Sequence, residues 1–171
     1  MRLMTGILCI IVSGVIALSS CKKNDASPGN FFSYNNQTYS VNSAFYFDLQ
    51  TNGEVLIFSD LDASTVTSNS KVNYTAMQLG VPVTNNLLPT GTFTYLDSTN
   101  SKYDKSKNFS KAGIILNGTL DLNSFTIPQS SIQSGAITIA KNDTGYVITY
   151  TFVFSDGRTL AGAYTGIVNK I

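Results

Sequence analysis

The alternation of large and small side chains in residues 145–154 is the feature that most restricts how this chain can fold. The segment reads GYVITYTFVF, with a bulky side chain at every second position from Tyr146 onward. A period of two is the period of a β-strand with one buried face, and it does not suit a helix. The side chains expected on the buried face are Tyr146, Ile148, Tyr150, Phe152 and Phe154.

A turn and a second strand follow directly. The sequence Ser155-Asp156-Gly157-Arg158 contains Asp-Gly, the preferred centre of a two-residue hairpin, and 159–168 is the next expected strand. Gly162 and Gly166 leave room in that strand for close packing or for a bend. Counting back from a two-residue turn pairs Phe154 with Thr159, Phe152 with Ala161, Tyr150 with Ala163, Val153 with Leu160 and Thr149 with Tyr164.

The remainder of the chain shows the same kind of pattern and no long helical period. Turn residues such as Asn35-Asn36 and Thr51-Asn52-Gly53 separate the short apolar segments. About nine or ten strands at hairpin spacing predict an all-β fold, either an antiparallel β-sandwich or a lipocalin-like barrel, because both show this alternation. The other expected strands are 31–34, 37–41, 44–49, 54–58, 71–80, 91–96, 112–116 and 135–140.

The N-terminus has the pattern of an export signal that ends at a cysteine. Arg2 precedes an apolar run over residues 7–18, which is too short for a membrane span of ~20 residues. Leu18-Ser19-Ser20-Cys21 then offers small residues for a signal peptidase and a thiol for lipid attachment. An ordinary signal or anchor with an incidental cysteine is the alternative. We therefore expect a lipoprotein signal peptide at 1–20, lipidation of Cys21, a tether at 21–30 and a single β domain at 31–171.

Three segments together give the chain a family resemblance. They are the cysteine signal, an opening FxYNxxxYxV from Phe32 to Val41, and a closing GxITIxKxxxGYxITYxFxxxDGxxLxGxYTG over 135–166. The chain resembles the small β-rich lipoproteins common in Bacteroidota. The resemblance implies a lipid anchor in the outer membrane of the cell envelope and a sandwich or lipocalin-like barrel, but no shared activity. Surface-displayed members often carry acidic residues just after the cysteine, whereas Lys22 and Lys23 stand here, so the surface or periplasmic side stays open.

Composition removes several classes of function. The chain has no histidine, and its only cysteines are Cys9, inside the expected signal, and Cys21. Serine–histidine and cysteine–histidine nucleophiles and the usual zinc sites are thereby excluded, and we expect no cofactor. Without Arg2, ten Lys and Arg balance ten Asp and Glu, so no basic face for nucleic acid is expected. The cluster of Lys102, Lys105, Lys107 and Lys111 around Asp104 reads as a solvated loop.

Few motifs carry chemistry. Glu54 is the only glutamate and stands at a turn, where a satisfied or solvated carboxylate is the simpler interpretation than a catalytic acid. Ser68-Asn69-Ser70-Lys71 has the S-x-x-K spacing without the helix start that this chemistry needs. Asp60-Leu61-Asp62 begins like a calcium loop but lacks the later glycine and glutamate. Asp97-Ser98-Thr99 resembles an O-glycosylation acceptor but also suits a plain turn.

Tyrosine is the residue type that could carry recognition, because it offers a stacking face and a hydroxyl. We expect most of these side chains to belong to the core. The chain is thus predicted to be a lipid-anchored envelope protein with a non-enzymatic binding or structural role, with the membrane and a possible glycan or protein as partners. A carrier of a small apolar ligand is the alternative. The tyrosines considered are Tyr39, Tyr46, Tyr74, Tyr95, Tyr103, Tyr146, Tyr150 and Tyr164.

Overall fold

A computed structural model describes residues 29–48, 53–65, 70–121, 125–127 and 131–171. The expected signal peptide, Cys21 and the tether up to residue 28 lie outside the described residues. The all-β prediction is confirmed, because strands make up nearly all of the regular structure. The strands are β1 (Phe31–Tyr34), β2 (Gln37–Ser40), β3 (Ser43–Asp48), β4 (Glu54–Ser59), β5 (Ser70–Leu79), β6 (Gly91–Tyr95), β7 (Asn108–Leu120), β8 (Ile132–Asn142), β9 (Gly145–Phe154), β10 (Thr159–Gly166) and β11 (Val168–Lys170), with one 3-10 turn at Ala63–Thr65.

All of these strands belong to one sheet, and its topology corrects the sequence prediction in three ways. The order is β11-β3-β4-β5-β7-β6-β8-β9-β10-β1-β2, which is eleven strands rather than nine or ten. The sheet is mixed rather than antiparallel, because β11 pairs with β3 and β6 pairs with β7 in parallel. The sheet is also open, since among the described residues its terminal strands β11 and β2 do not pair to close a barrel.

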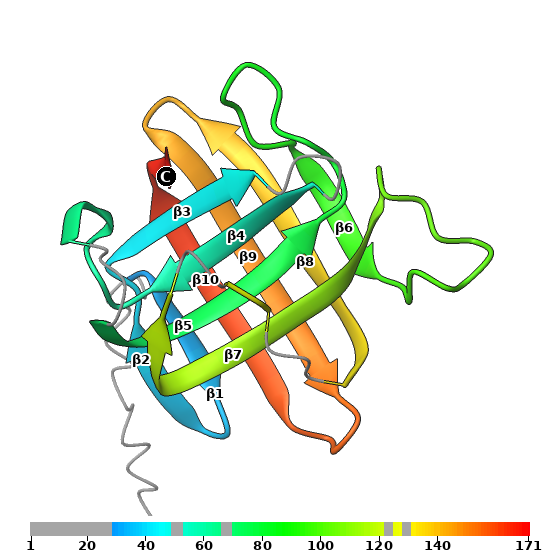
Figure 1. The fold of residues 1–171 in the computed structure, drawn as a ribbon, viewed down its shortest axis with the longest axis horizontal. Helices are drawn as coiled ribbons and strands as arrows, with labels where there is room; N and C mark the ends of the chain where they lie inside the picture. The colour runs from blue at the N-terminus through cyan, green and yellow to red at the C-terminus, as the bar shows by residue number, and fades with distance from the viewer. Residues whose placement is uncertain (1–28, 49–52, 66–69, 122–124, 128–130) are drawn as a thin grey trace, which may run out of the picture.

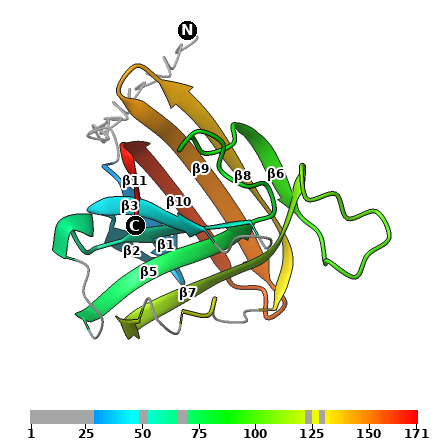
Figure 2. The ribbon, with the colours of Figure 1, turned by 45° about the horizontal axis from the view of Figure 1, so that its top comes forward.

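The open sheet folds over on itself into two layers (Figures 1 and 2). Strands β3, β4, β5 and β7 form the front layer in Figure 1, and β8, β9, β10 and β1 run behind them in a different direction. The main core fills the space between the layers. Phe58 of the front layer stacks on Tyr150 with ring centroids 4.9 Å apart, and Phe109 meets Phe152 at 5.3 Å. The alternation that predicts β9 thus becomes the inner wall of the back layer.

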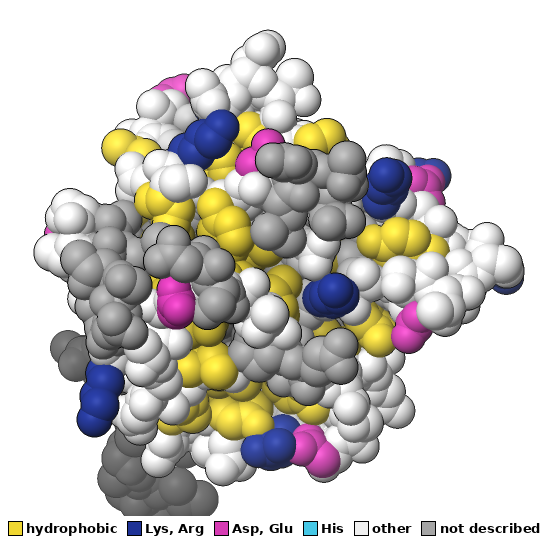
Figure 3. Space-filling view, in the orientation of Figure 1, with side chains coloured by type: hydrophobic (Ala, Val, Ile, Leu, Met, Phe, Trp, Pro, Cys, Tyr) yellow, Lys and Arg dark blue, Asp and Glu magenta, His cyan; other side chains and the backbone are white. Residues whose placement is uncertain are grey.

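The front layer is buried on its outer face as well. Every residue of β4 is buried, and the side chains on its two faces belong to two separate hydrophobic clusters. Phe45, Ile57 and Tyr74 belong to the outer cluster, and Phe125 packs edge-on to Phe47 at 5.0 Å. Figure 3 shows hydrophobic side chains across this face, with positive and negative side chains interspersed around them. The connection from β7 to β8 therefore contributes to a second, smaller core.

The register of the β9–β10 hairpin differs by one residue from the prediction. The turn has three residues rather than two, because Gly157 N donates to Phe154 O at 2.9 Å and Phe154 N donates to Arg158 O at 2.9 Å. Gly157 takes a φ of 81°, which a glycine adopts without strain. A one-residue shift moves every side chain of a strand to the other face, and this shift puts Leu160 and Tyr164 inside. The observed pairs are Val153 with Thr159, Phe152 with Leu160, Tyr150 with Gly162, Thr149 with Ala163 and Ile148 with Tyr164.

The two glycines of β10 act as expected. At Gly162, an added Cβ would lie 2.2 Å from the Tyr150 ring, so this aromatic side chain packs directly on the glycine backbone. At Gly166, a φ of 153° ends the strand. The expected strand 159–168 is therefore interrupted, and the chain continues as β11 alongside β3. The bend at Gly166 joins a strand of the back layer to the far edge of the front layer.

Candidate functional site

The most distinctive polar group in the described structure is the carboxyl of Glu54. It is 1% exposed, so of the two expected alternatives, a satisfied or a solvated carboxylate, the solvated one is wrong. Its Oε1 accepts a hydrogen bond from Val83 N at 2.9 Å. Its Oε2 is buried and has no hydrogen-bond partner among the described residues. Buried polar atoms are nearly always paired, so this atom marks a special position.

The local sequence explains how Glu54 becomes buried. Gly53 has a φ of 84°, and an added Cβ would lie 2.0 Å from Leu79 O. Only glycine therefore lets the chain turn tightly against the end of β5. Glu54 then pairs with Leu79 in the sheet, and the main chain brings its carboxyl beneath the β5–β6 loop, residues 80–90.

Two tyrosines bind the same loop. Tyr46 Oη donates to Asn86 O at 3.3 Å, and Tyr146 Oη accepts from Leu88 N at 2.9 Å. Tyr46 is on β3 and Tyr146 is on β9, so the two layers contribute one hydroxyl each. We call Tyr46, Glu54 and Tyr146 the anchoring cluster, because each holds one point of the β5–β6 loop.

The loop is itself a small hairpin. Thr84 and Leu87 exchange backbone hydrogen bonds at 3.2 Å and 3.0 Å, and Asn85 and Asn86 between them have φ values of 54° and 59°. Asparagine tolerates this left-handed conformation better than most residues. Leu88 then enters the core while Leu87 stays 45% exposed. The anchoring cluster thus fixes a rigid turn over one end of the folded sheet.

Burial controls the electrostatics of the anchoring cluster. It raises the pKa of Glu54, and the charge of Asp48 raises it further, while the hydrogen bond from Val83 and the charge of Lys170 act in the opposite direction. Burial also raises the pKa of Tyr46, with added contributions from Glu54 and Tyr146. A carboxyl with a raised pKa can serve as an acid. Here a reactant would first have to displace the β5–β6 loop, so the geometry suits a structural anchor better than a catalytic acid.

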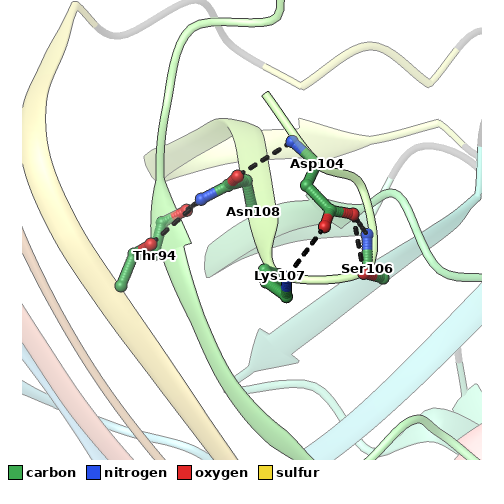
Figure 4. Close-up of polar contacts among 5 residues, drawn as sticks. All are labelled: Thr94, Asp104, Ser106, Lys107 and Asn108. Carbon is green, nitrogen blue, oxygen red and sulfur yellow. Dashed lines mark hydrogen bonds and ion pairs between the residues drawn. The ribbon is translucent and has the colours of Figure 1, made fainter. Parts of the chain in front are cut away.

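The lysine-rich β6–β7 loop is a second site to consider, and it is a self-contained turn structure (Figure 4). Asp104 Oδ1 accepts from Ser106 N at 2.9 Å and from Ser106 Oγ at 2.6 Å, while Oδ2 lies 3.2 Å from Lys107 Nζ. These contacts lower the pKa of Asp104 to about 2. Asn108 closes the base by donating to Thr94 O at 3.2 Å and accepting from Asp104 N at 3.0 Å. The lysines are exposed around this turn, as predicted for a solvated loop.

The acidic side chains of the weak sequence motifs make local hydrogen bonds in turns and at a strand end. Both carboxylate oxygens of Asp60 bind Asn73, at 3.0 Å and 2.8 Å, so they secure a strand end rather than face an open calcium site. The carboxylate of Asp62 caps Ser64. Over the described ranges, no three acidic or thiol side chains form a metal-binding group. Asp97 caps the backbone of Thr99 in a turn. The S-x-x-K match cannot be placed, because Ser68 lies outside the described residues.

Most of the tyrosines belong to the core, as expected. Tyr150 donates or accepts a buried hydrogen bond with Thr75 at 2.7 Å across the layers. Tyr39 stacks on Phe32 at 4.9 Å, so its ring is also engaged. Three tyrosines in the list considered are partly exposed: Tyr39, Tyr95 and Tyr103. The buried ones are Tyr46, Tyr74, Tyr146, Tyr150 and Tyr164.

Comparisons with models of protein families, with curated proteins and with solved structures gave no match to this chain. Within the described part of the chain, no helix has the length and apolar character to cross a membrane.

Proposed function

We propose that this chain is a lipid-anchored protein of the bacterial cell envelope, held by Cys21, whose β domain has a non-enzymatic binding or structural role. The observation that carries the proposal is the short distance in sequence between the cysteine signal and the folded domain. Asn30 is already fixed to the sheet, since its Nδ2 donates to Thr165 O at 3.1 Å and its Oδ1 accepts from Thr165 N at 2.7 Å. Nine residues, or about 30 Å of extended chain, join Cys21 to that point.

Two further observations support a role without catalysis. The sequence supplies no histidine and no cysteine beyond Cys9 and Cys21, and the one buried carboxyl found at the candidate site is closed over by a bound loop. The face drawn in Figure 3 mixes positive with negative side chains and shows no continuous basic area of the kind that nucleic acid requires. Turnover of a glycan or ester substrate by the purified protein would overturn this part of the proposal.

Lipidation is tested by substitution of each cysteine in turn. Cells expressing the tagged full chain are fed an alkyne-bearing palmitate, and the labelled protein is separated on a gel. The wild type and the matched control Cys9→Ala are expected to carry label and to fractionate with membranes, whereas Cys21→Ala carries none. Label that persists in Cys21→Ala, or that is missing from the wild type, would refute the anchor.

The side of the membrane is tested by protease digestion of intact and lysed cells. Digestion of the domain on intact cells indicates surface display and directs the search for partners to glycans and proteins outside the cell. Protection until lysis indicates a periplasmic domain and directs the search to envelope proteins. A resident periplasmic protein in the same cells controls for leakage.

A carrier of a small apolar ligand is the second candidate, because the aromatic row of β9 does face inward. However, Tyr150 stacks on Phe58 and bonds to Thr75, so protein side chains fill this level of the interior. Mass spectrometry of the organic extract of purified protein tests the carrier role. One apolar molecule recovered per chain, after the anchor lipid is accounted for, would favour the carrier.

A further inference from the structure

Four large hydrophobic side chains are exposed among the described residues, and they all come from segments that meet at one end of the folded sheet. The exposed fractions are 66% for Ile167, 45% for Leu87, 41% for Ile171 and 37% for Val147. Scattered single cases are normal on a protein surface, but their gathering at one end is informative.

Backbone contacts show that the four segments converge. Val147 is paired with Thr165 two residues before Ile167. Ile171 N donates to Tyr46 O at 3.0 Å, which places the C-terminus beside the anchoring cluster. Leu87 lies between the two loop residues bound by Tyr46 and Tyr146. Figure 1 shows the β9–β10 turn at the opposite end of β9 from the β8–β9 turn. We call this the apolar end, defined by Leu87, Val147, Ile167 and Ile171.

The chain enters the domain at the apolar end. Thr165, which holds Asn30 through two hydrogen bonds, is the partner of Val147 in the sheet and lies two residues from Ile167. An attachment at residue 21 therefore holds the domain to the membrane at this end. Nine residues of chain allow at most about 30 Å between Cys21 and Asn30.

We propose that the apolar end rests on the surface of the lipid bilayer, with Ile167 and its neighbours inserted at headgroup depth. This inference builds on the proposed lipid anchor at Cys21. The anchor enters the domain at the same end as the exposed aliphatic side chains, so it brings them to the membrane without a further binding partner. Contact with the bilayer then removes these side chains from water.

The charges near the apolar end are compatible with a headgroup layer. Lys141 is opposite Tyr146 in the sheet and Lys170 is beside Tyr46, and both side chains are exposed. Long lysine side chains can extend their charge into the headgroups while their stems follow apolar surface. Asp143 in the β8–β9 turn is a nearby negative charge, so we expect modest salt dependence rather than a strongly electrostatic attachment.

Contact at the apolar end fixes an orientation. Strand β9 has ten residues, so at ~3.3 Å per residue the β9–β10 turn stands up to about 30 Å farther from the bilayer than the β8–β9 turn. Ser155 in that turn is exposed and provides a control position. The β9–β10 turn, with Asp156 and Arg158, would then be presented away from the membrane.

The absence of tryptophan from the sequence allows a direct test. Ile167→Trp, Leu87→Trp and the control Ser155→Trp each introduce a single reporter at an exposed site. The full chain is expressed with its own signal, purified from membranes and reconstituted into phosphatidylcholine–phosphatidylglycerol vesicles with acyl chains brominated near the headgroup. Flotation on a density gradient measures attachment, and tryptophan quenching by bromine measures contact.

We expect all three variants to float and the tryptophans at 167 and 87 to lose about half or more of their emission, because side chains inserted 5–10 Å into the interface lie near the bromines. Ser155→Trp should be unchanged. Flotation without quenching at either apolar position overturns the docking while leaving the anchor intact. Equal quenching at all three positions overturns the orientation. Failure to float refutes the anchor and the docking that depends on it.

Discussion

Glu54→Gln gives the sharpest test of the anchoring cluster, because it removes the one carboxyl in the cluster, whose pKa burial raises. Burial raises the pKa of Glu54 above its ordinary value of 4.5. The folded protein then holds this proton more tightly than the unfolded chain does. The resulting stabilisation is fully present below pH 4.5 and is lost as the pH rises through the folded-state pKa.

The size of the effect follows from one proton. A single group changes the free energy of unfolding by at most about 1.4 kcal/mol per pH unit. We therefore expect the stability of the wild type to fall with rising pH above 4.5 and then to level off, whereas Glu54→Gln lacks this slope. The glutamine oxygen can still accept the hydrogen bond from Val83 N. Its amide nitrogen takes the place of Oε2, which has no partner among the described residues, so the substitution also changes the absolute stability. The slope of stability against pH is therefore the better measure.

The other carboxylates with a shifted pKa act below this pH range. The chain has no histidine, and the exposed carboxylates with hydrogen-bond partners have a lowered pKa, so their stabilisation is lost only as the pH falls. Urea unfolding followed by circular dichroism from about pH 4.5 to about pH 8 measures the slope. Asp97→Asn, at an exposed turn, is the matched control and should keep the wild-type slope. Parallel curves for the wild type and Glu54→Gln would refute the assignment.

Three further substitutions test the packing by urea unfolding or hydrogen exchange. Tyr150→Phe should destabilise by about 1–3 kcal/mol, because Thr75 Oγ1 loses its buried partner; a change below that range would contradict the interlayer bond. Gly162→Ala should cost about 1–3 kcal/mol, because its Cβ would clash with the ring of Tyr150, and unchanged stability would mean that the ring moves freely. Tyr146→Phe should speed exchange of the Leu88 amide with little effect on the amides of β9, and a uniform increase would indicate global destabilisation instead.

The strands were predictable from sequence wherever alternation coincided with turn residues. The ranges 31–34 and 145–154 are observed as expected, and Asn35-Asn36 forms the turn between β1 and β2 with φ values of 50° and 62°. These features depend on neighbours along the chain, because the two-residue period and the left-handed turn are local properties. The sequence alone therefore established the all-β class and most strand positions.

The register and the sheet order required tertiary information. The Asp-Gly pair suits turns of two or three residues, and the choice was made by the burial of Leu160 and Tyr164, which depends on the opposite layer. Strand β11 was missed because three residues carry little periodic signal and their partner, β3, is more than a hundred residues earlier. Its parallel pairing arises from the bend at Gly166.

At the candidate site, too, the sequence predicted individual residues, and tertiary contacts decided how they are arranged. The sequence identified Glu54 as the single glutamate and the tyrosines as mainly core residues, but it gave no sign that Tyr46, Glu54 and Tyr146 would meet over one loop. Their meeting depends on two layers of a sheet that only the folding of distant strands brings together. The export pattern ending at Cys21 is a linear signal that enzymes would read on an extended chain, so the sequence alone carries that prediction. The position of the exposed aliphatic side chains near the entry of the chain was decided by the tertiary structure, because Asn30 meets Thr165, two residues before Ile167, only in the folded sheet.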